Sequence, residues 1–208
     1  MKNIIFKENF DELFFNLEQI LWNCQPSLIF QKVMPQVWFN ELMNMCYFSY
    51  YLLIGSVCIL IYLKSPKNSQ KDIFVIVFSF YLYYVIFDIF PVAGPHYYVA
   101  GADSDVTPRL FFGELMHTII SDLERPTAAF PSSHVGIAVI IAYFAYKHVK
   151  KVFYVILPFV LGICMATVYI KAHYLVDVIA GIISAPLFIL LSNKVYALFL
   201  RFNSSKPI

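Results

Sequence analysis

The segment His173-Tyr174-Leu175-Val176-Asp177 places a histidine four residues before an aspartate. A carboxylate at this spacing can activate the imidazole as a nucleophile. On a helix, residues four positions apart share one face, so the imidazole of His173 lies one turn from the carboxylate of Asp177. We expect Asp177 to accept the Nδ1 proton of His173, which leaves Nε2 unprotonated and more nucleophilic. The same two residues could instead form a structural polar pair that joins two helices.

A second segment, Phe130-Pro131-Ser132-Ser133-His134, has the pattern of a helix start. Proline suits the first helical turn, and Ser132 or Ser133 can cap it. The N–H groups of such a first turn, together with the helix dipole, bind anions, so we expect an anion site beside His134. An ordinary N-cap next to a histidine that reaches toward the membrane interface is the alternative.

The elements that carry both segments are predicted to be helices in a membrane. Of the 208 residues, 60% are apolar and 13% are charged, and the mean hydropathy is +0.70, whereas soluble domains are about a quarter charged. The 18% of aromatic residues exclude a disordered chain, and a net charge of +2 argues against a nucleic-acid partner. Four cysteines without a CxxC pair indicate neither a zinc site nor a disulfide scaffold. We therefore expect an all-α integral membrane bundle, with residues 1–208 in a single domain.

Five stretches approach the about 20 apolar residues that cross a bilayer. They predict spans at about 43–63, 73–90, 133–149, 152–170 and 173–192. Residues 1–40 hold apolar positions at helical spacing and predict an amphipathic helix, which lies along the membrane surface or packs on the bundle. The polar face of that helix is formed by Asp11, Glu12, Asn16 and Glu18. In the outer loop, 91–132, Thr107 and Pro108 start a second predicted surface helix over the site.

The charged residues divide between the two sides of this topology. If the helices alternate, nine cationic residues share one side, which are Lys64, Lys67, Lys71, Lys147, Lys150, Lys151, Lys194, Arg201 and Lys206. The positive-inside rule assigns that side to the cytoplasm. The opposite side holds Asp88, His96, Arg109, His117, Arg125, Ser132, Ser133, His134, Lys171, His173 and Asp177. Because ionisable groups that cluster at the ends of spans indicate function, we expect an active site on the extracytoplasmic face of the cytoplasmic membrane.

Two motifs resemble those of a known family. Pro131-Ser132-Ser133-His134 and, 39 residues after His134, the segment His173–Asp177 resemble the second and third signature motifs of the type 2 phosphatidic acid phosphatase superfamily, PSGH and SRxxxxxHxxxD. The segment Phe90–Tyr98 is similar to the exit loop of the branch that includes inositol-phosphorylceramide synthase-like proteins. The resemblance covers roughly residues 90–185.

The resemblance implies phosphoryl transfer, without a metal ion or another cofactor, on a phosphorylated lipid in the bilayer. His173 would attack phosphorus and form a phosphohistidine, with Asp177 orienting the ring. His134 would protonate the departing alcohol and later help to activate water or an acceptor hydroxyl. The side chains and amides of Ser132 and Ser133 would hold the phosphate oxygens.

The sequence departs from the family pattern at the cationic positions. Ala166 and Thr167 stand where the third motif begins with Ser-Arg, and Lys171 stands two residues before the expected nucleophile instead. The first motif, KxxxxxxRP, is matched only at its end, by Arg125-Pro126, and His96 stands where an arginine is common. The expected phosphate ligands are therefore Lys171, Arg125, Arg109 and His96.

These residues fit more than one function. The first is a phosphatase that hydrolyses a phosphomonoester or diphosphate lipid. A phosphotransferase, which moves a headgroup between lipids, would use the same intermediate, whereas a non-catalytic lipid-binding or transport protein would keep the histidines as structural residues. A metal site built from His134, His173 and Asp177 is a further alternative, and it predicts loss of activity with a chelator.

Overall fold

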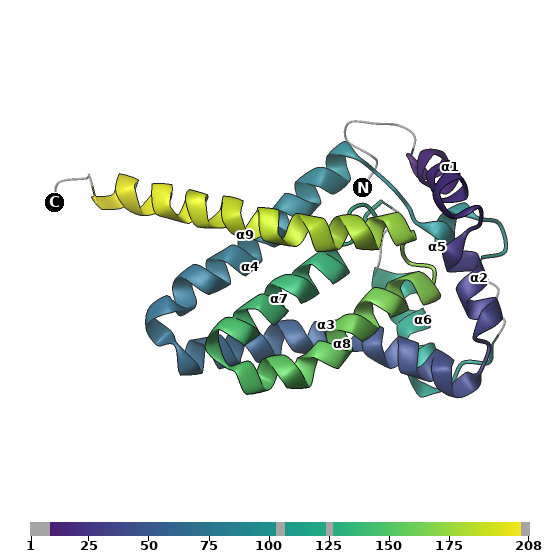
Figure 1. The fold of residues 1–208 in the computed structure, drawn as a ribbon, viewed down its shortest axis with the longest axis horizontal. Coiled ribbons are helices and arrows are strands. Elements are labelled where there is room, and N and C mark those ends of the chain that lie inside the picture. The colour runs from purple at the N-terminus through teal and green to yellow at the C-terminus, as the bar shows by residue number, and fades with distance from the viewer. Residues whose placement is uncertain (1–8, 103–106, 124–126, 205–208) are drawn as a thin grey trace.

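The chain folds as a bundle of helices. In the computed structural model the described residues are 9–102, 107–123 and 127–204, and within them an isolated β-bridge joins Val92 to Ala128. The helices of this part of the chain (Figure 1) are α1 (Asp11–Trp22), α2 (Pro26–Val33), α3 (Val37–Lys64), α4 (Pro66–Ile89), α5 (Pro95–Tyr98), α6 (Phe111–Leu123), α7 (Ser133–His148), α8 (Lys150–Tyr169) and α9 (Leu175–Ser204).

Four of the described helices are long and apolar enough to cross a membrane, so the chain is an integral membrane helical bundle. The crossing stretches are Val37–Lys64 in α3, Ser69–Ile89 in α4, Lys150–Tyr169 in α8 and Leu175–Phe202 in α9. The expected span at 133–149 corresponds to α7, whose 16 residues rise about 24 Å, less than the about 30 Å of the hydrocarbon layer. Among the described helices, α7 is thus a short helix beside the four long ones, and it runs toward the end of the bundle where the α7–α8 connection lies (Figure 1).

The short helix α7 lies in the middle of the bundle, in contact with α3, α4, α8 and α9 (Figure 1). Its buried residues are Val135, Gly136, Ile137, Ala138, Ile140, Ile141, Ala142, Phe144 and Ala145. A Cβ atom at Gly136 would lie 1.6 Å from the Tyr83 hydroxyl, and one at Gly181 of α9 would lie 2.6 Å from the Ser132 carbonyl oxygen. Because glycine has no Cβ, α4 and α9 can approach α7 closely. The start of α7 therefore lies against α9.

The helices α1, α2, α5 and α6 gather over one end of the bundle (Figure 1), and we call these four helices the helical cap. At the same end α3, α7 and α9 begin. The α3–α4 and α7–α8 connections lie at the other end, where the last turns of α9 extend past its neighbours. There Asp72 of α4 contacts Lys147 and His148 of α7, with Oδ1–Nζ and Oδ2–Nε2 distances of 3.0 Å and 2.6 Å. This cluster holds the far end of α7 in place.

Helix α1 turns two of its acidic side chains inward. Asp11 and Glu18, which the sequence places on the polar face of an amphipathic helix, are buried. Its apolar residues Leu13, Leu17, Ile20 and Leu21 are instead exposed. An amphipathic helix that packs on a soluble core has the opposite arrangement. Helix α1 thus contacts the bundle through Asp11 and Glu18, which accept hydrogen bonds from backbone N–H groups of the bundle.

Candidate active site

The start of α7 is the place where the sequence predicts an anion site. Ser132 is the N-cap, and its Oγ accepts a hydrogen bond from Val135 N at 3.4 Å. The remaining N–H groups of a first helical turn have no carbonyl partner within the helix, and the helix dipole adds partial positive charge. Ser133 and His134, the first two residues of α7, both line the large groove described below. The predicted anion site therefore has a physical basis in this turn.

The start of α9 differs, because carboxylates of the protein already occupy it. Asp177 Oδ2 accepts a hydrogen bond from Tyr174 N at 2.8 Å, which is half of a capping box. Glu18 Oε1 of α1 accepts hydrogen bonds from Leu175 N and, at 3.3 Å, from Val176 N. An external anion would be repelled there. These two carboxylates leave the start of α9 unsuited to a phosphate.

The two histidines of the motifs face each other. His173 Nε2 lies 3.5 Å from His134 Nδ1, and the ring centroids are 5.7 Å apart. His173 Nδ1 lies 2.8 Å from the carbonyl oxygen of Ala129. A carbonyl oxygen can only accept, so Nδ1 carries the proton and the lone pair of a neutral His173 is on Nε2. The unprotonated nitrogen is thus the one that faces His134.

The partner of His173 Nδ1 differs from the expected one. We expected Asp177 to accept this proton, but its Oδ2 lies 3.6 Å away, beyond ordinary hydrogen-bond range. The carbonyl of Ala129 takes that role, and Asp177 acts as a cap of α9 and as a nearby negative charge. A carboxylate so close to the ring stabilises positive charge that develops on it.

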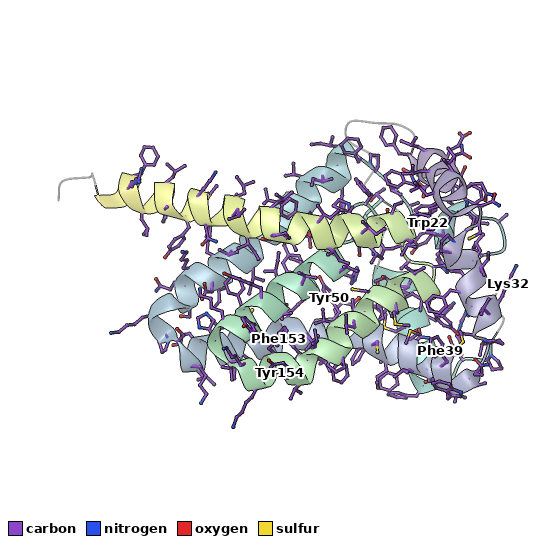
Figure 2. All side chains as sticks on the ribbon, viewed as in Figure 1. Trp22, Lys32, Phe39, Tyr50, Phe153 and Tyr154 are labelled. Carbon is purple, nitrogen blue, oxygen red and sulfur yellow. The ribbon has the colours of Figure 1, made fainter. Side chains whose placement is uncertain are left out.

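Tyrosine side chains of α3 pack around His134. The ring centroids of Tyr47 and Tyr50 lie 4.7 Å and 4.5 Å from that of His134. Both tyrosines are buried, and Tyr50 is labelled inside the bundle in Figure 2. Sequence reasoning missed them, although their three-residue spacing on one face of a predicted span is a signal that can be recognised.

A groove of about 920 Å³ contains both histidines. From them it runs between α3 and α4 along apolar and aromatic side chains such as Ile54 and Phe80. Its lining residues Tyr51, Tyr84 and Val85 are exposed, so the groove reaches the flank of the bundle. An apolar groove on the side of a membrane bundle suits acyl or isoprenyl chains.

A second, smaller cavity of about 70 Å³ adjoins the groove, and we call it the polar pocket. Its polar lining residues are Gln31, Asn40, Asn44, His96, Arg109, His117 and Lys171. His96, Ile120 and Ile170 line both cavities, so the two meet there. Lys171 is buried, and its Nζ donates a hydrogen bond to Ala102 O at 2.6 Å.

The structure divides the predicted phosphate ligands between these places. Ser133 lines the groove, whereas the Ser132 side chain is buried as a helix cap. Arg109 and Lys171 line the polar pocket, and His96 lines both cavities. Arg125 lies outside the described residues. No group of three or more His, Cys, Asp or Glu side chains in the described part of the chain could hold a metal ion.

Two buried carboxylates of α1 were missed by the sequence reasoning. Burial raises the pKa of Glu18 to about 7, although the N–H groups of Val176 and Leu175 act in the opposite direction. Burial also raises the pKa of Asp11, against the effect of its hydrogen bonds from Ala93 and Gly94. The sequence pattern separates the acidic from the apolar face, but it does not tell which of them meets the protein.

Comparison with known proteins gives the family. A family model described as the PAP2 superfamily matches residues 14–191, which include both histidine motifs, the α3 tyrosines and most of α1. No curated protein and no solved structure matched the sequence. The matched residues make up most of the 208-residue chain. With its paired motif histidines inside a membrane bundle, the chain belongs to the PAP2 superfamily, that is, the type 2 phosphatidic acid phosphatase superfamily.

Proposed function

We propose that the chain is a metal-independent lipid-phosphate phosphatase, which hydrolyses a phosphomonoester or diphosphate lipid through a phosphohistidine. Membership of a superfamily of phosphatases and phosphotransferases supports an enzyme of this kind. The observation that carries the proposal is the orientation of His173. Its Nδ1 is held by the Ala129 carbonyl at 2.8 Å, while Nε2 faces His134 in the groove.

The proposed reaction has two steps. His173 Nε2 attacks phosphorus, and the bond from phosphorus to the lipid oxygen breaks as His134 gives that oxygen a proton. A water molecule then attacks the phosphohistidine, His134 takes its proton, and inorganic phosphate leaves. Because a phosphoryl group does not fit between nitrogens 3.5 Å apart, substrate entry has to move the two rings apart.

The phosphate oxygens need positive charge around them. We assign this task to the first turn of α7 with Ser132 and Ser133, to Lys171 and Arg109 of the polar pocket, and to His96, which lines both cavities. Arg125 remains a predicted ligand from outside the described residues.

The surroundings of the site support a lipid substrate. The groove opens on the flank of the bundle, where a lipid can enter sideways from the bilayer. The site lies at the end of the bundle that the helical cap covers. The α3–α4 and α7–α8 connections at the other end carry six lysines, which are Lys64, Lys67, Lys71, Lys147, Lys150 and Lys151. By the positive-inside rule we assign the site to the extracytoplasmic face of the cytoplasmic membrane.

Release of inorganic phosphate tests the proposal. The full chain in mixed micelles would be given phosphatidic acid, phosphatidylglycerol phosphate and an isoprenyl diphosphate, one at a time. We expect release from at least one lipid, with inhibition by vanadate and resistance to chelator, and loss of release in His173→Ala. Equal turnover by His173→Ala and the wild type would overturn the assignment of the nucleophile. Inactivation by chelator would favour the metal alternative.

The polar pocket favours a second candidate, a phosphotransferase that moves a headgroup between lipids. Amide side chains of Gln31, Asn40 and Asn44 line this pocket, and together with Lys171 they offer hydrogen bonds to a polar headgroup next to the groove. An acceptor hydroxyl would then replace water in the second step. A labelled headgroup that appears on a second lipid, without free phosphate, would select this reaction over hydrolysis. If neither the wild type nor the variant changes any lipid chemically, lipid binding or transport is the function that remains.

A further inference from the structure

We propose that helix α1 positions the nucleophile, with Asp11 and Glu18 holding the segments before and after His173. This inference rests on the proposed function, because it takes His173 as the attacking group. Asp11, Phe14 and Glu18 form the buried side of α1. Neither carboxylate lines the groove, so each would act through backbone contacts and not on the substrate.

Asp11 holds the loop that follows α4. Its Oδ2 accepts a hydrogen bond from Ala93 N at 2.8 Å, and its Oδ1 accepts one from Gly94 N at 2.9 Å. The Tyr174 hydroxyl also donates to Asp11 Oδ1, at 3.3 Å. One buried carboxylate therefore ties the loop to the residue that follows His173.

The same loop is hydrogen-bonded to the segment that orients the His173 ring. Val92 O accepts a hydrogen bond from Ala129 N at 2.9 Å, and Ala129 O accepts the one from His173 Nδ1. Gly94 lies so close to the next segment that a Cβ atom there would be 2.4 Å from Ala172 O. A shift of the loop would therefore reach the nucleophile both through Ala129 and through Ala172.

Glu18 holds the segment on the other side of His173. Its Oε1 accepts hydrogen bonds from Leu175 N and Val176 N, which are the first two N–H groups of α9. These groups have no acceptor within the helix. Without Glu18 the first turn of α9 would lose a buried acceptor, and the turn that begins two residues after His173 would be free to move.

Helix α1 buries two carboxylates and exposes apolar side chains, and this arrangement is the reason to assign a positioning role to Asp11 and Glu18. Four backbone N–H groups of the site region depend on them, whereas Leu13 and Ile20 of the same helix are exposed. Burying a carboxylate is unfavourable unless hydrogen bonds compensate for its lost hydration. Glu12 is exposed on the same helix and supplies a matched acidic control.

Kinetics and histidine spectra of the full chain in micelles test this inference together. The variants Asp11→Asn and Glu18→Gln keep the size of each side chain, and Glu12→Gln removes an exposed charge from the same helix. With phosphatidic acid as the first probe, we expect kcat to fall about 10- to 100-fold in the first two variants, with KM little changed, because small misplacements of a reacting group cost that much. Glu12→Gln should match the wild type.

The second readout does not depend on turnover. In ¹⁵N-histidine NMR spectra, we expect the wild type to show His173 protonated on Nδ1, with the signal assigned by its loss in His173→Gln. Asp11→Asn and Glu18→Gln should show a mixture of both tautomers, and Glu12→Gln should not.

The outcomes separate the two proposals. An unchanged tautomer in both variants overturns the positioning role, whether kcat falls or only the melting temperature does. If Asp11→Asn does not fold, Glu18→Gln carries the test alone, since it leaves the loop contacts of Asp11 intact. If the wild type hydrolyses no lipid phosphate, the proposed function fails, while the spectra still decide whether α1 orients His173.

Discussion

The close contact between α7 and α9 makes Gly181→Ala a sharp test of the active-site geometry. In the structure, a Cβ atom at Gly181 would lie 2.6 Å from Ser132 O and 3.2 Å from Val135 Cβ. The first distance is about 1 Å shorter than van der Waals contact. Both neighbours belong to the start of α7, so the added methyl group pushes the start of α7 away from α9, and with it His134 away from His173.

The size of the effect follows from that displacement. A misplacement of about 1 Å at a reacting group can lower the rate about 100-fold, and overpacking a helix contact costs about 1–3 kcal/mol of stability. We therefore expect kcat of Gly181→Ala to fall by about 10- to 100-fold, with a lower melting temperature. Both would be measured in micelles, by phosphate release and by thermal unfolding.

Gly55→Ala is the matched control. Gly55 lies in α3, and a Cβ atom there would meet nothing within 4 Å. Alanine favours a helix by about 1 kcal/mol over glycine, so this variant should be as stable as the wild type or more so, with unchanged kcat. If Gly181→Ala has the same kcat as Gly55→Ala, the reasoning that links helix contact to the histidine pair is refuted.

Three further predictions concern other parts of the bundle. Asp72→Asn should lower the free energy of unfolding by about 1–3 kcal/mol, because it weakens the contacts of the buried Asp72 carboxylate with Lys147 and His148. The kcat of the folded variant should not change, since the cluster lies at the far end of α7, and a fall in kcat would contradict this. Burial raises the pKa of Glu18 from 4.5 to about 7, so its contribution to stability is fully present below pH 4.5 and is lost as the pH rises through 7. Unfolding curves at several pH values should show this loss of stability, and Glu18→Gln should abolish the pH dependence. Ser132→Ala should cost about 1 kcal/mol of stability through the lost cap and lower kcat as well, and an effect on stability alone would separate the cap from the phosphate site.

The starts of α7 and α9 could be predicted from the sequence because helix capping is local. Proline and serine before His134, and aspartate four positions after His173, are signals within a few residues of the feature they create. The membrane character of the bundle was equally accessible, because it depends on composition and on the length of apolar stretches.

Other parts of the site depend on tertiary contacts and have no local signal. The acceptor of the His173 Nδ1 proton is a backbone carbonyl, that of Ala129, and every residue has one. In a membrane protein the apolar face of α1 can point outward, so periodicity does not reveal that Glu18 points inward. The length of α7 could be predicted from the sequence, but only the packing around it shows that this helix lies in the centre of the bundle.

The most direct test of the account is to find the phosphorylated residue. The full chain would be mixed with phosphatidic acid carrying a labelled phosphate, quenched with alkali to preserve phosphohistidine, and analysed by mass spectrometry of its peptides. We predict a phosphoryl group on His173 in the wild type and none in His173→Ala. Turnover of the labelled lipid with no phosphoryl group on His173, or with the group on another residue, would contradict the account.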